Sequence, residues 1–93
     1  MFTVTREMIV AFAKFFSIDL TDGSQEPGVI GSINNIAAGH SNGHKLAFLF
    51  DAPENRETFA PLRKAFFEAQ GFPEPAYSNV HADQSVAGEG QSA

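Results

Sequence analysis

The sequence predicts a small α+β domain, with two main helices at about residues 6–18 and 58–70 packed on a two- or three-stranded sheet. Two amphipathic stretches predict the helices, and the uninterrupted apolar run at residues 46–50 predicts a central strand at about 45–50. The length of 93 residues allows one domain. We expect it to span residues 1–80, followed by a flexible tail at 81–93 that is rich in Gly, Ser, Gln and Ala.

The first helix is predicted by apolar residues that recur at helical spacing between Met8 and Phe16. Thr5 stands at the expected N-cap, and Glu7 follows in the first turn, where a negative charge is favourable. Phe12 falls at the centre of the apolar stripe and is expected to be buried. Residues 2–5 alternate apolar side chains with Thr, which favours a short strand before this helix.

The central strand is predicted because five apolar residues are too few for an independent helix and the run stops at Asp51 and Pro53. In a strand, Leu46, Phe48 and Phe50 would share one face. Both faces would be apolar, so we expect the strand to be covered on both sides and Phe48 to be buried. Asp51, followed three residues later by Glu54, is typical of a helix N-cap.

The second helix is predicted by an inward stripe made of Phe59, Leu62, Phe66 and Ala69. Pro61 fits its first turn, where the missing N–H is not needed, and Gly71 fits the left-handed position after its end. Residues 76–80 are a candidate edge strand. Residues 29–38 fit a short helix, but Asn42-Gly43 is a hairpin signal that would pair 36–41 with 44–49, and the sequence leaves both open.

Composition excludes several classes of function. A net charge of −5 with six basic residues argues against nucleic-acid binding, which needs a concentrated positive surface. The absence of cysteine excludes thiol catalysis and cysteine-ligated zinc, and it favours a reducing compartment such as the cytoplasm. No apolar run approaches the ~20 residues of a membrane span, so no membrane partner is expected. No cofactor is expected either, because neither a phosphate-binding loop nor a set of metal ligands is found.

Four short motifs resemble sites that carry chemistry in other proteins. Gly39-His40-Ser41-Asn42-Gly43 matches G-x-S-x-G and resembles the nucleophile elbow of the α/β-hydrolases, which would imply a nucleophilic Ser41. His40 and His44 are four residues apart, as zinc ligands on a helix are, but the small residues between them favour a turn and no metal site is predicted. Asp19, Asp22 and Glu26 lack the alternation of a calcium loop. The segment 66–72 resembles the helix end found in small acetyltransferases and glyoxalase-type domains.

The favoured interpretation is a non-enzymatic, acidic protein-binding module: an adaptor, subunit or inhibitor, a profile that also fits a viral or mobile-element accessory protein. Its candidate partner-binding residues are two apolar residues off the helical stripe and three basic ones, namely Val10, Ile18, Arg56, Arg63 and Lys64. Two alternatives stay open. One is a minimal hydrolase-like or metal-dependent enzyme centred on Ser41 with His40 or His44. The other is an obligate homo-oligomer that uses surplus Phe at its interface.

Overall fold

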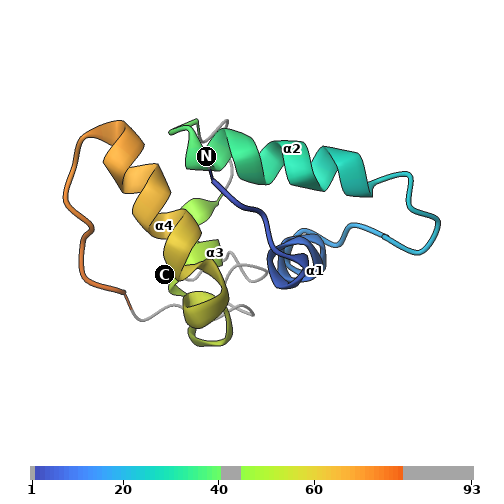
Figure 1. Cartoon of the computed structure of the whole chain (residues 1–93). Coiled ribbons are helices and arrows are strands. Elements are labelled where there is room, and N and C mark those ends of the chain that lie inside the picture. The colour runs from blue at the N-terminus through green and yellow to red at the C-terminus, as the bar shows by residue number, and fades with distance from the viewer. Residues whose placement is uncertain (1, 41–44, 79–93) are drawn as a thin grey trace.

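The structure, a computed structural model, describes residues 2–40 and 45–78. Its elements in chain order are α1 (Arg6–Phe15), α2 (Glu26–Ala37), α3 (Leu46–Asp51), the 3-10 turn η1 (Pro53–Asn55) and α4 (Arg56–Gln70). Figure 1 shows α2 running across the view above α1, which is seen almost end-on, with α4 beside them. No strand occurs in the described residues, so the α+β prediction was wrong and the domain is all-α.

The first helix was predicted correctly. The Thr5 side chain accepts a hydrogen bond from the Met8 N–H at 3.2 Å, as expected of an N-cap. The helix ends at Phe15, earlier than predicted, because Ser17 adopts a left-handed φ of 58° and Ile18 N–H returns to the Ala13 carbonyl oxygen at 2.7 Å. Residues 2–5 form no strand.

Residues 29–37, which the sequence left open, lie in the helix α2 and not in a hairpin, and Ala38 is the C-cap. Pro27 lies in its first turn, where a missing N–H costs nothing. Gly39 ends the helix with a φ of 97°, and a Cβ at this position would come within 3.0 Å of the Ala69 Cβ. Gln70 donates a side-chain hydrogen bond to the Gly39 carbonyl oxygen. A glycine is therefore needed where the end of α2 meets the end of α4.

The central strand is replaced by α3. Its buried apolar residues are Leu46, Leu49 and Phe50, the i, i+3, i+4 pattern of a helix, whereas Phe48 is only half-buried. A helix this short is not stable alone, so burial of these three side chains against the rest of the molecule must hold it. The prediction that Phe48 is buried was therefore wrong.

The predicted second helix is α4, which begins two residues early and contains Pro61 in its second turn. Gly71 has the expected left-handed φ of 82°, and Phe72 N–H donates to the Phe67 carbonyl oxygen at 3.1 Å to complete the cap. Ala69, predicted to face inward, is exposed.

The core is built mainly from the inner faces of the four helices and is rich in Phe, as the composition indicates. Phe12 is 2% exposed, which confirms its prediction, and its ring lies 4.7 Å from that of Phe16. Within the described residues, the fully buried large side chains come from α1, α2, α3 and α4 and comprise Phe12, Phe59, Met8, Ile33, Ile36, Leu49, Leu62 and Val29.

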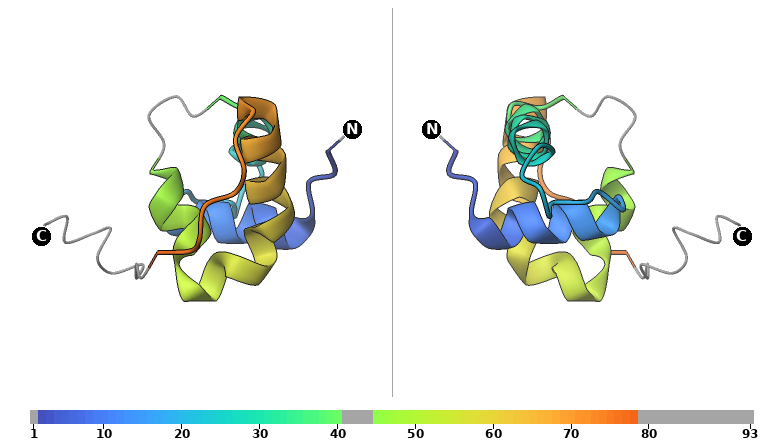
Figure 2. Two further views of the ribbon diagram at one scale, coloured as in Figure 1. Left: turned by 90° about the vertical axis from the view of Figure 1, so that its left-hand side faces the viewer. Right: turned by 90° about the vertical axis from the view of Figure 1, so that its right-hand side faces the viewer.

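After α4 the chain turns back. Figure 2 shows residues 72–78, in orange, running past α4 toward α3. We call residues 72–78 the strap. Residues 76–78 are not a strand, and the predicted tail at 81–93 lies outside the described residues. No helix in the described part of the chain combines the length and apolar character that crossing a bilayer requires.

Candidate functional site

Arg63 is the centre of a polar cluster that joins α3, α4 and the strap. It lies four residues after Phe59 and three before Phe66, so it shares the inward stripe of α4 and is only 3% exposed. Burying a charged side chain costs solvation free energy, so the charge must be paired and hydrogen-bonded inside the fold. The partners of Arg63 therefore show what the cluster does.

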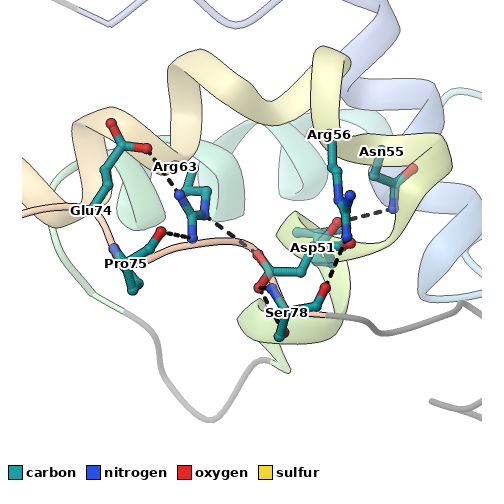
Figure 3. Close-up of polar contacts among 8 residues, drawn as sticks. Asp51, Asn55, Arg56, Arg63, Glu74, Pro75 and Ser78 are labelled. Carbon is teal, nitrogen blue, oxygen red and sulfur yellow. Dashed lines mark hydrogen bonds and ion pairs between the residues drawn. The ribbon is translucent and has the colours of Figure 1, made fainter.

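The Arg63 guanidinium binds two elements at once (Figure 3). Its Nη1 donates a hydrogen bond to Oε1 of Glu74 at 3.1 Å, and its Nη2 donates to the carbonyl oxygen of Pro75 at 2.6 Å. Its Nε lies 3.4 Å from Oδ1 of Asp51, an ion pair that lacks the alignment of a hydrogen bond. One buried cation thus connects the strap to the end of α3.

Asp51 holds the far end of the strap. It is 6% exposed, and its Oδ2 accepts hydrogen bonds from the Ser78 N–H at 2.9 Å and the Ser78 hydroxyl at 2.8 Å. The predicted role of Asp51 as a helix cap was wrong, because Asn55 occupies the N-cap position of α4. Asn55 makes no capping bond with its side chain and instead donates Nδ2 to the Leu49 carbonyl oxygen at 3.1 Å.

Tyr77 is held by two guanidinium groups. The Cζ of Arg63 lies 4.1 Å from the centre of its ring, and the Cζ of Arg56 lies 4.9 Å from it, both within the range of cation–π attraction. Arg56 also donates Nε to the Asp51 carbonyl oxygen and Nη2 to the Ser78 carbonyl oxygen, each at 2.8 Å. The strap is therefore fastened at Glu74, Pro75, Tyr77 and Ser78.

These contacts leave two large side chains of the strap in solvent. Phe72 is 62% exposed and Tyr77 is 40% exposed. Pro73 and Pro75 each fix their own backbone φ angle. The result is an extended segment that is locked to the helical body and presents aromatic surface outward. We call this surface, with the half-buried Arg56, the strap face.

The five predicted partner-binding residues fall into two groups. Val10 is 50% exposed on α1, Lys64 is exposed on α4, and Arg56 is half-buried, so these three present atoms to solvent. Ile18 instead packs against the core, and Arg63 is buried. Ile18 is half-buried rather than exposed. The expectation that Arg63 lies on the surface was wrong, because its ion pairs hold it inside the fold.

The hydrolase-like motif starts at the end of a helix. The nucleophile elbow requires a strand before its serine, whereas Gly39 and His40 follow α2. His40 is exposed, and its N–H donates to the Asn35 carbonyl oxygen at 2.9 Å. Ser41 and His44 lie outside the described residues. Among residues 2–40 and 45–78 there is no group of three or more His, Cys, Asp or Glu side chains able to hold a metal ion.

The acidic side chains at residues 19–26 serve the local backbone and one ion pair. Oδ1 of Asp19 accepts from the Thr21 N–H, and Oδ1 of Asp22 accepts from the Ser24 N–H, both at 2.9 Å. Hydrogen bonding to these backbone N–H groups lowers the pKa of both carboxyl groups, since it favours the charged form. Glu26 pairs with Arg6 at 2.7 Å.

Sequence reasoning missed the roles of Asp51, Tyr77 and Ser78, because contacts between α3 and the strap depend on the tertiary fold. One signal was present: Arg63 is in register with the apolar stripe of the second helix, four residues after Phe59. A basic residue on an inward stripe indicates a buried charge that needs an acidic partner.

No family model, no curated protein and no solved structure matches this chain.

Proposed function

We propose that the protein is a non-enzymatic protein-binding module that engages its partner through the strap face. The observation that supports this is the exposure of Phe72 and Tyr77, at 62% and 40%, on a segment that is fastened to the body of the domain. An exposed aromatic side chain on a segment held in place is a candidate anchor for a protein interface. The adaptor, subunit and inhibitor roles all use such a surface.

The fastening makes the strap face a suitable binding surface. A free peptide loses conformational freedom when it binds, and this cost lowers its affinity. Here the hydrogen bonds that Arg63 donates and Asp51 accepts fix the strap before any partner arrives, and Pro73 and Pro75 restrict it further. Tyr77 and Phe72 are thus presented as preordered anchors.

The side chains of the strap face match those that contribute most to protein interfaces. Tyr and Arg are over-represented among the residues whose truncation costs the most affinity, and aromatic residues are enriched at interface centres. Tyr77 stacked on Arg56 provides this combination, with Phe72 at the other end of the strap. The corresponding partner is a protein with an apolar pocket for an aromatic ring. We place this function in the cytoplasm, as the lack of cysteine favours a reducing compartment.

The test is a comparison of charge insertions in the full-length chain. A partner is first captured from the native host by cross-linking and mass spectrometry, and its Kd is then measured for Phe72→Asp, Val10→Asp and Asn34→Asp. Asn34 is exposed on α2 and gains the same charge, so it is the matched control. We expect Phe72→Asp to weaken binding at least about tenfold, a loss of about 1.4 kcal/mol, while Asn34→Asp has no effect.

Two results would contradict the proposal, provided that circular dichroism shows every variant folded. If Phe72→Asp binds like the parent while Val10→Asp does not, the partner uses α1 and the strap face is not the site. If Ser41→Ala alone abolishes biological activity, the enzyme interpretation replaces the binding one.

A further inference from the structure

The strap lies outside the hydrophobic core. Every residue of the core cluster, and every apolar residue packed against it, comes from residues 2–66 of the described chain. The strap is held by hydrogen bonds, ion pairs and the stacking of Tyr77 on arginine. Detaching residues 72–78 would therefore leave the core intact, and such a segment can open at a free energy below that of global unfolding.

The surface under the strap recognises a specific short segment. Asp51, Arg56 and Arg63 form this strap-binding surface, and each of them binds a different set of groups. Arg63 binds the Glu74 carboxylate and the Pro75 carbonyl oxygen, Asp51 binds the N–H and hydroxyl of residue 78, and Arg56 binds the carbonyl oxygen of that residue. The surface thus fits an extended peptide with an acid, an aromatic ring and a hydroxyl group in the order found at positions 74, 77 and 78.

We infer that a second copy of this chain can supply that peptide, so that two copies exchange straps and form a two-fold symmetric dimer. The charge complementarity is already present: each copy carries both the strap-binding surface and a strap that fits it. Because the exchange is reciprocal, the dimer closes on itself. This inference does not depend on the proposed partner or on the exposure of Phe72.

The connection between α4 and the strap allows the exchange. Gly71 reverses the chain with a φ of 82°, and a glycine can leave that conformation for an extended one without steric cost. Pro73 and Pro75 then favour an extended strap, which rises about 3.1 Å per residue in the polyproline geometry. A change at this one hinge would point the strap away from its own body and toward a neighbour.

Two complementary full-length variants test the exchange. The strap variant carries Glu74→Gln, Tyr77→Ala and Ser78→Ala, all at exposed positions, so its strap-binding surface is intact but its own strap fits poorly. The surface variant carries Arg56→Ala, and a second surface variant carries Arg63→Met in case one of them fails to fold. When the strap variant is mixed with either surface variant, the intact strap of one chain can dock on the intact surface of the other.

We expect the equimolar mixture to dimerise at least tenfold more tightly than either variant alone, measured by sedimentation equilibrium and by native mass spectrometry, which identifies the heterodimer by mass. Replacing the surface variant by Lys64→Ala, which leaves its own surface and strap intact, is expected to remove this gain. A mixture that stays monomeric up to about 1 mM, the effective concentration of a short tether, would overturn the inference. Equal dimerisation of the strap variant alone would also overturn it, since the interface would then lie elsewhere.

Discussion

Arg63 is buried at 3% exposure although it carries a full charge, and this residue determines how the C-terminal part of the structure is arranged. A buried ion pair adds little net stability, because desolvation offsets the attraction between the charges. Removing one partner is different, since it leaves the other charge buried without compensation. Asp51, whose side chain is 9% exposed, is the group that would be left.

The burial of Arg63 in its ion pair predicts that truncating it destabilises the fold far more than truncating the neighbouring Lys64. Arg63→Ala should lower the free energy of unfolding by about 3–5 kcal/mol, because it leaves Asp51 without a cation and opens a void beside Phe67. Lys64→Ala, at an exposed position of the same helix, should change it by less than about 0.5 kcal/mol. Urea unfolding of the two variants measures both values. Losses of similar size would mean that Arg63 is not buried in its ion pair.

The sequence alone could not show by charge that Arg63 is buried and Lys64 is exposed. Arg63 and Lys64 are adjacent, and acidic residues at helical spacings made both look like parts of a solvated surface. Only the register of Arg63 with Phe59 distinguishes it, and its partners Asp51 and Glu74 are 12 and 11 positions away. Contacts at that distance depend on how α3 and the strap pack.

Among the elements, α1 and α4 could be predicted because each has several turns of helical periodicity and a local end signal. Thr5 begins the first, and Gly71 ends the second. The helix α3 could not be predicted, because five consecutive apolar residues carry no periodicity. Its helical form depends on tertiary burial that the sequence of the segment does not encode. The fold class was wrong mainly for this reason, since the predicted sheet was built around this segment, and the flanking residues 2–5 and 76–78 form no strand either.

The helical register of α3 predicts which of its side chains matters more. Leu49 is 0% exposed, so Leu49→Ala should cost about 2–5 kcal/mol of unfolding free energy. Phe48 is half-buried, and Phe48→Ala should cost clearly less, although it removes a larger side chain. Thermal and urea unfolding of both variants shows which substitution costs more unfolding free energy. A greater loss of unfolding free energy for Phe48→Ala than for Leu49→Ala would support the strand register, in which Leu46, Phe48 and Phe50 share a face.

At the scale of the whole molecule, a helical body is complete in its core, and the strap adds a polar, aromatic surface to it. The proposed partner binding at the strap face and the inferred strap exchange both depend on the strap being separate from the core. They differ in what they need from the strap. Partner binding needs its outward side chains, whereas the exchange needs its inward contacts to Asp51, Arg56 and Arg63.

The most direct test of this account is whether the strap is ordered in solution, and backbone ¹⁵N relaxation measures that order residue by residue. We predict order parameters near 0.85 at Glu74, Ala76, Tyr77 and Ser78, similar to those of α4, and a fall below about 0.6 in Asp51→Ala but not in Lys64→Ala. Values below about 0.6 at these residues in the parent chain would show that the strap is not fastened, and would contradict the account.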